Sequence, residues 1–204
     1  LVLRQNSQSE LQSGLGRDQI PLIRALPGIE KDADGKPLVS AEIYLAVRRI
    51  KLDGGEVNVP IRGVQPATFD VLGSDVRIGE GRNFTPGTDE VIVGRKLVDR
   101  IQNCRLDDVL QLNTTPFHVV GVFDHDGPFA SEIWGDRNRI SEALERPIYN
   151  RVIARLKEGT DLEELGERLL NDAQVPCKVM TEREYLTSQT EAMSYVLKIL
   201  GMFL

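Results

Sequence analysis

The chain has 204 residues, a formal net charge of −6 and a pI of about 5.1. Nucleic-acid binding requires a concentrated basic surface, so this charge argues against a nucleic-acid partner and gives no support to the binding of anionic lipid. With 41% hydrophobic and 27% charged residues, the chain can bury a core. This composition excludes a disordered protein and predicts one globular domain or two small ones.

The N-terminal residues predict a strand, a loop and a short helix. Residues 1–3 are apolar enough for a strand, and residues 6–16 are polar, rich in Ser and Gln, and typical of a loop. Asp18 is placed to cap a helix that carries apolar residues as far as Leu26. Pro27 and the glycine after it end this helix.

The clearest strand covers residues 38–50. Its apolar positions from Val39 to Val47 alternate with more polar ones, and this period of two predicts a half-buried strand. Residues 53–55, Asp-Gly-Gly, predict a hairpin turn followed by a returning strand. Pro60 lies on the returning strand and cannot donate to a ladder, so we expect that strand at an edge of the sheet.

The middle of the chain, residues 79–136, predicts a compact and strand-rich unit. Short β-type runs alternate with Gly, Pro, Asn and Asp. The expected elements are a turn-rich run at 79–87, strands at 91–93, 109–112 and 117–123, a short helix around 97–101, and a closing segment at 131–136.

The next part of the chain predicts a β-α-β run. A short helix ends before Pro147, a strand covers 149–156, and a second strand covers 175–180. Between these strands, Thr160 to Glu163 predicts a capping box, and the helix that it starts carries three leucines on one stripe. A similar β-α-β order occurs in residues 1–47. Two such halves around an insertion predict a layered α+β subdomain that is interrupted by a second subdomain.

The last predicted helix covers residues 181–204. Its first half is amphipathic and its end is apolar on all sides, which fits a helix that leaves a protein surface and enters lipid. The weakly polar run at 192–204 is shorter than the roughly 20 residues that span a bilayer. We interpret the chain as a piece of a membrane protein that ends just inside a transmembrane helix.

The candidate chemical groups do not form a recognisable site. His118 alternates with apolar neighbours and is expected at the surface, and the segment around His125 is favoured as a solvated turn over a metal site. Residues 32–35 lack the later ligands of a calcium loop, so a turn is favoured. The pairs Ser9-Glu10 and Ser131-Glu132 lack a nucleophile elbow, so solvated or hydrogen-bonded loop roles are favoured.

The remaining candidates have structural explanations too. Cys104 and Cys177 are interpreted as separate thiols that pack as small hydrophobes, although an extracytoplasmic site would permit a disulfide and their pairing stays open. Trp134 is expected in a core or between subdomains. Turn geometry explains the glycines at 79, 81, 87 and 94, which lack the ending of a phosphate loop, and an exposed strand edge explains the basic residues at 48, 49 and 51. We therefore expect no catalytic, cofactor-binding or metal-binding residues and no cofactor.

Four motifs follow one another in the middle of the chain: E-G-R-x-F-T-P-G at 80–87, E-V-I-V-G-R at 90–95, V-V-G-V-F-D at 119–124 and S-E-I-W-G-D at 131–136. Their order resembles the extracytoplasmic domain of MacB/FtsX-type ABC transporter permeases. Segments at 2–4, 9–15 and 32–42 match as well, so the resemblance covers nearly the whole chain.

The resemblance implies a division of the chain and a setting for it. A Porter-like subdomain would consist of residues 1–66 and 147–181, a Sabre-like inserted subdomain of 67–146, and a helix at 182–204 would lead into a transmembrane span. One membrane helix before this chain and three after it are implied. The domain would lie on the periplasmic, extracytoplasmic side of a bacterial inner membrane.

The resemblance also implies partners. They are a second permease, as a homodimer or heterodimer, and a cytoplasmic ABC ATPase on a separate chain, because no ATP-binding module is present here. A periplasmic adaptor, a lipoprotein or a cell-wall hydrolase regulator would dock outside. The domain would couple ATP hydrolysis to export or to mechanical signalling. Two alternatives stay open: a module that binds a small ligand or peptide between its subdomains, and, least favoured, an enzyme.

Overall fold

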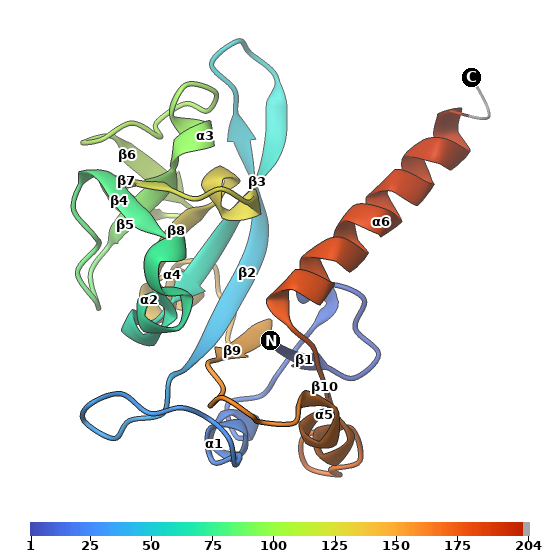
Figure 1. Ribbon diagram of the computed structural model, residues 1–204. Helices are drawn as coiled ribbons and strands as arrows, with labels where there is room; N and C mark the ends of the chain where they lie inside the picture. The colour runs from blue at the N-terminus through green and yellow to red at the C-terminus, as the bar shows by residue number, and fades with distance from the viewer. Residues whose placement is uncertain (202–204) are drawn as a thin grey trace.

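The computed structural model describes the backbone of residues 1–201 and the side chains of residues 1–191. Within that part, ten strands form one mixed sheet in the order β10-β1-β9-β2-β3-β8-β5-β7-β4, with β6 paired to β7 (Figure 1). The strands are β1 (Val2–Arg4), β2 (Val39–Ile50), β3 (Glu56–Val64), β4 (Arg77–Gly81), β5 (Glu90–Gly94), β6 (Val109–Leu112), β7 (Thr115–Asp124), β8 (Ile133–Asp136), β9 (Arg151–Ala154) and β10 (Cys177–Val179).

Six α-helices and three short 3-10 helices accompany this sheet in the described part of the chain. The α-helices are α1 (Gln19–Arg24), α2 (Pro66–Leu72), α3 (Arg95–Val98), α4 (Arg137–Ala143), α5 (Leu162–Leu170) and α6 (Glu182–Gly201). The 3-10 helices are η1 (Glu10–Gln12), η2 (Gly73–Asp75) and η3 (Pro128–Ser131).

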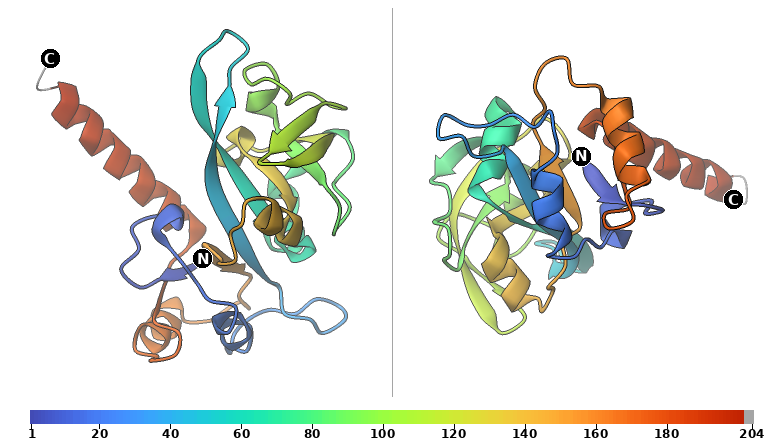
Figure 2. Two further views of the ribbon diagram at one scale, coloured as in Figure 1. Left: turned by 180° about the vertical axis from the view of Figure 1, so that it is seen from behind. Right: turned by 90° about the horizontal axis from the view of Figure 1, so that it is seen from below.

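The two ends of the chain interleave in one part of the sheet. Strand β1 pairs with both β9 and β10, and β9 also pairs with β2, all antiparallel. Helices α1 and α5 cover one face here, where Ile23 and Leu169 pack with Val39 and Ala41 of β2; Figure 2 shows these two helices near one another. This arrangement of two β-α-β halves confirms the predicted α+β fold class.

The rest of the sheet is the predicted strand-rich unit. Strands β3, β8, β5, β7 and β4 follow in order, and helices α3 and α4 cover the face that carries Ile61, Val93 and Ile133. The opposite face carries an aromatic cluster around Trp134. The long β2–β3 hairpin belongs to both parts, so one continuous sheet joins them. The boundaries of the two subdomains stay a prediction.

Several local expectations were wrong. Strand β3 is not an edge strand, since it lies between β2 and β8, although its pairing with β8 starts only after Pro60, at Ile61. Asp18 makes no capping hydrogen bond, because its backbone is already helical (φ −67°, ψ −26°). The residue that caps α5 is Asp161 and not Thr160; its carboxylate accepts from the amides of the second and third helical residues.

The last helix, α6, is continuous from Glu182 to Gly201 and projects away from the sheet (Figure 1). A capping box fixes its start: the amide of Thr181 donates to Glu184 Oε2 at 2.7 Å, and the amide of Glu184 donates to Thr181 Oγ1 at 3.1 Å. No helix in the described residues combines the length and the apolar character that a membrane span needs. The predicted apolar end at 195–204 lies outside the described side chains, and residues 202–204 lie outside the described backbone.

Candidate functional site

The sheet register brings oppositely charged side chains together on one face. Glu42 of β2 is directly opposite Arg151 of β9, and Tyr44 of β2 is opposite Arg62 of β3. On its other side, Arg62 is opposite Trp134 of β8. Residues directly opposite in a ladder share a face, so all five side chains lie on the face that α1 and α5 leave free.

Arg62 is the centre of a buried ion network. Its Nε and Nη2 donate to both carboxylate oxygens of Glu132, at 2.7 and 2.9 Å, and its Nη1 donates to Glu10 at 2.7 Å and to Glu42 at 3.3 Å. The side chain of Arg62 is only 2% exposed, and those of the three glutamates are 5% exposed or less. One guanidinium thus joins β3, η1, β2 and the residue before β8.

Arg151 completes the network from the neighbouring strand. Its Nε donates to Glu42 at 2.6 Å, and its Nη1 donates to Glu10 at 3.1 Å and to Glu182 of α6 at 3.2 Å. Its Nη2 is buried without a hydrogen-bond partner among the described residues. We use the name ion network for five residues: Glu10, Glu42, Arg62, Glu132 and Arg151.

Neutral groups satisfy the remaining oxygens of the carboxylates. The hydroxyl of Thr68, from α2, lies 2.8 Å from Glu42 Oε1, and the indole Nε1 of Trp134 donates to Glu132 Oε2 at 2.7 Å. Two aromatic rings lie against the guanidinium of Arg62. Its Cζ is 4.6 Å from the ring centre of Tyr44 and 5.2 Å from the ring centre of Phe129. Each carboxylate oxygen of the network accepts at least one hydrogen bond.

Opposite charges keep Glu10 and Arg62 ionised despite their burial. Burial alone would raise the pKa of Glu10, but Arg151 and Arg62 outweigh it and hold that pKa below its ordinary value. Burial would likewise lower the pKa of Arg62, but Glu10 and Glu132 raise it well above the usual range. Removing one partner of such a buried pair leaves an uncompensated charge, which typically costs about 3–5 kcal/mol.

Helix α6 is attached directly to this network. Besides the pair between Glu182 and Arg151, the hydroxyl of Tyr185 accepts a hydrogen bond from the backbone amide of Glu10 at 3.1 Å. One turn later, the amide of the Gln189 side chain donates to the carbonyl of Gln8 at 2.9 Å. The start of α6 is therefore held by Arg151 of the ion network and by the backbone of residues 8–10.

The structure brings together the glutamates of the two Ser-Glu pairs, which the sequence did not predict. Glu10 and Glu132 both bind Arg62, so their expected hydrogen-bonded role is confirmed, and a solvated one is wrong. No cluster of three metal-binding side chains occurs in the described residues. His118 is exposed as expected. His125 lies in a turn, where its Nδ1 accepts from the amide of Gly127 at 2.7 Å.

The other residues singled out in the sequence have packing roles. Cys104 and Cys177 are free and fully buried in different hydrophobic clusters, so their interpretation as separate packed thiols is confirmed. Trp134 is fully buried in a core, as expected. Gly81 has a positive φ of 67° at the end of β4, after the register shift between Ile78 and Glu80. Gly94 differs from a turn glycine, since a Cβ there would collide with the backbone of residue 130.

Sequence reasoning missed Glu42, Arg62 and Arg151. Each was read as part of an alternating strand whose polar positions face outward, yet all three are fully buried. A signal was present, since Arg62 lies between Ile61 and a run of small and apolar residues, and Arg151 precedes an apolar run. A charge in such a run indicates a buried ion pair, but it does not identify the partner.

Comparison with known proteins identifies the family. A family model described as the MacB-like periplasmic core domain matches residues 3–171. The extracellular domain of the noncanonic ABC-type transporter YknZ from Gram-positive bacteria has a similar structure, with a TM-score of 0.63, 16% identity, and 88% of this chain and 98% of that chain covered. The periplasmic region of MacB from Actinobacillus actinomycetemcomitans has a TM-score of 0.62 and 14% identity, with 95% of this chain and 90% of that chain covered. No curated protein sequence matches this chain.

At these identities the two structures establish a shared fold, and the family match covers most of the chain. The predicted resemblance is thereby confirmed. The chain belongs to the family of MacB-like periplasmic core domains and is the extracytoplasmic core domain of a MacB-like ABC transporter permease.

Proposed function

We propose that this domain couples ATP hydrolysis by a cytoplasmic ATPase subunit to export or to mechanical signalling outside the inner membrane. In this proposal α6 is the mechanical connection, and the ion network is the joint through which its motion enters the domain. The observation that carries the proposal is the direct attachment of the first turn of α6 to the network, through Glu182 and Tyr185.

The composition of the network supports this role. Glu10, Glu42 and Arg151 come from the two halves that flank the insertion, whereas Glu132 comes from the inserted segment. Arg62 binds carboxylates from both. A force on Glu182 therefore acts on side chains that hold both parts of the domain, and a shift of one buried charge affects all of its partners.

The wider setting belongs to the same proposal. The domain is non-catalytic, two permeases associate in the membrane, and a separate chain hydrolyses ATP. The continuation of α6 enters the bilayer, and a periplasmic adaptor or lipoprotein docks outside. The alternative of a ligand- or peptide-binding module has one observation in its favour, a cleft between α6 and the segment that holds His125 and Phe129. A ligand-dependent rise in the melting temperature of the isolated chain would support it.

A helix-breaking substitution tests the coupling. Thr190→Pro in the full-length transporter removes a backbone donor from the middle of the described helix, costs about 3 kcal/mol of local helix stability and kinks α6. We expect membrane insertion and basal ATP hydrolysis to remain while the transport or signalling output collapses. Thr190→Ser is the matched control, with nearly normal output expected. Full output from a correctly folded proline variant would refute the proposal.

A further inference from the structure

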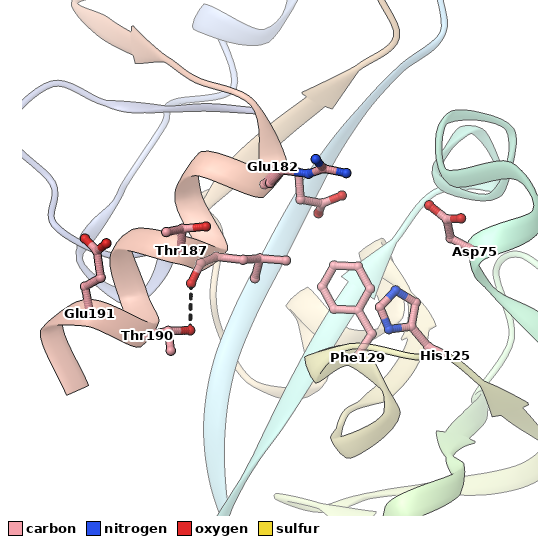
Figure 3. A pocket seen from close by; sticks show the side chains of 9 residues that line it. Asp75, His125, Phe129, Glu182, Thr187, Thr190 and Glu191 are labelled. Carbon is pink, nitrogen blue, oxygen red and sulfur yellow. Dashed lines mark hydrogen bonds between the residues drawn. The ribbon is translucent and has the colours of Figure 1, made fainter. Parts of the chain in front are cut away.

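A cleft of about 480 Å³ separates the first three turns of α6 from the inserted part of the domain. Six residues of α6 line one wall: Glu182, Arg183, Leu186, Thr187, Thr190 and Glu191. Asp75 of η2, His125 and Phe129 of η3 form the opposite wall, as Figure 3 shows. The two walls belong to the same chain, so a tilt of α6 would change the width of the cleft.

The two walls are chemically complementary. Arg183 on α6 and Asp75 on the opposite wall are both exposed, and neither has an ion-pair partner within the described residues. Leu186 is a half-buried apolar side chain on the α6 wall. The ring of His125 packs on Phe129 opposite, with the ring centres 4.7 Å apart. The open cleft thus leaves one cation and two anions unmatched, because Glu191 on the α6 wall also lacks an ion pair in the described residues. Its apolar surface consists of Leu186 and the ring of His125, since Phe129 itself is buried.

The contacts of α6 favour rotation about its first turn. Glu182 also lines the cleft, but Arg151 already binds its carboxylate, and Tyr185 is held by the amide of Glu10. Farther along the described helix, a single side-chain hydrogen bond, from Gln189 to the carbonyl of Gln8, holds it to the loop on its other side. Breaking this one bond would release the helix beyond its first turn.

We infer that α6 has a second, seated position, in which it tilts about its first turn into the cleft. There Arg183 pairs with Asp75, and Leu186 packs on the ring of His125, which lies against the buried Phe129. The hydrogen bond between Gln189 and Gln8 breaks as the helix moves. This inference deepens the proposed function, because it specifies the movement by which α6 reaches the inserted part of the domain.

Cysteine crosslinking of the purified 204-residue chain tests the seated position. The double variant Asp126→Cys/Thr190→Cys places one thiol on α6 and one on the exposed residue next to His125, so that His125 itself is kept; the native Cys104 and Cys177 are buried. The control pair is Asp126→Cys/Ser188→Cys, because Ser188 is exposed on the same helix but does not line the cleft. We expect the first pair to form a disulfide roughly tenfold faster, since bridging requires Cα atoms within about 7 Å.

Charge reversal identifies the contact that seats the helix. In the Asp126→Cys/Thr190→Cys protein, Arg183→Glu should slow crosslinking about fivefold at low salt, the size of one exposed ion pair. Adding Asp75→Lys should restore the rate, and 1 M salt should reduce the difference. As a matched control, Arg168→Glu makes the same charge change on α5 and should have no effect.

Equal crosslinking rates for the two cysteine pairs would overturn the inference. An unchanged crosslinking rate in the Arg183→Glu variant would overturn it as well. The measurement uses the isolated chain without nucleotide. A negative result therefore removes the seated position and leaves the test of the proposed function, which reads the output of the full-length Thr190→Pro transporter, unaffected.

Discussion

Tyr185 and Glu10 lie 175 positions apart in the chain, and the backbone amide of Glu10 donates a hydrogen bond to the Tyr185 hydroxyl at 3.1 Å. The hydroxyl is the acceptor for a buried amide, so its loss would leave that amide unpaired. This contact ties the helix that projects from the domain to the residue that binds both arginines of the ion network.

Removing this hydroxyl should loosen α6 more than it unfolds the domain. Tyr185→Phe keeps the buried ring and leaves the amide of Glu10 unsatisfied, which costs about 1–3 kcal/mol. We expect faster amide hydrogen exchange in the first turns of α6 and around Glu10, and a smaller decrease in the free energy of unfolding measured in urea. Tyr149→Phe is the control, since the Tyr149 hydroxyl makes no hydrogen bond in the described part of the chain. Unchanged exchange in Tyr185→Phe would contradict this view of the attachment.

The central arginine should be the most sensitive charged position in the domain. Arg62→Met leaves three buried carboxylates with one guanidinium and should cost about 3–5 kcal/mol of unfolding free energy. Arg62→Lys should also be costly, because lysine cannot make the bidentate contact with Glu132. Arg48→Met is the matched control: Arg48 pairs with Glu56 at the surface, where both side chains are mostly exposed, and should change stability by less than about 1 kcal/mol. Similar losses at Arg62 and Arg48 would be the contrary result.

The pH dependence of stability should reflect Glu10. Its pKa is lower in the folded protein than its ordinary value of 4.5, so the unfolded chain binds the proton more tightly. The contribution of Glu10 is therefore fully present above pH 4.5 and is lost as the pH falls through the folded pKa. Urea unfolding between pH 7 and pH 3 measures this loss. Glu10→Gln should lower stability at pH 7 and reduce the decrease on acidification; an unchanged decrease would show that other groups cause it.

Much of the fold followed from local patterns in the sequence, because period, turn residues and caps act over a few residues. The alternation in residues 38–50 predicted correctly that Val39, Ala41 and Ile43 are buried. It did not predict that Ser40 and Glu42 are buried as well. The second face of β2 is covered only because other segments fold over it, and no pattern within the strand contains that information.

The ion network was not predictable for the same reason. Glu42 binds Arg62 and Arg151, which are 20 and 109 positions away in the chain. Which arginines reach Glu42 depends on the strand order of the whole sheet. The order of four short motifs was a stronger guide, and it led to the correct family. It carried no information about which charges meet, since Glu132 is the only network residue within those motifs.

The two cysteines should be unreactive in the native protein. Burial raises the pKa of Cys104 and of Cys177 to about 11, so little thiolate is present at pH 8, and both side chains are fully buried. A thiol reagent such as Ellman's reagent should therefore label neither cysteine in the folded chain and both in 6 M guanidinium. Rapid labelling of native protein would show that one of the two hydrophobic clusters opens readily.

The contact between Glu182 and Arg151 should matter for coupling more than for stability. The side chain of Glu182 is 31% exposed, so Glu182→Ala leaves Arg151 with its two buried partners, Glu10 and Glu42, and should cost no more than about 1 kcal/mol. Arg151→Met instead leaves buried carboxylates uncompensated and should cost about 3–5 kcal/mol. If α6 transmits motion through this contact, Glu182→Ala in the full-length transporter should lower output while expression and basal ATP hydrolysis stay near wild type.

Glu191→Ala is the control for this prediction. It removes a carboxylate two to three turns farther along α6, with no ion pair in the described residues, and should leave output near wild type. Equal output from both variants would show that the contact between Glu182 and Arg151 does not transmit the motion, and Glu182→Ala combined with Tyr185→Phe would then test whether the Tyr185 contact does.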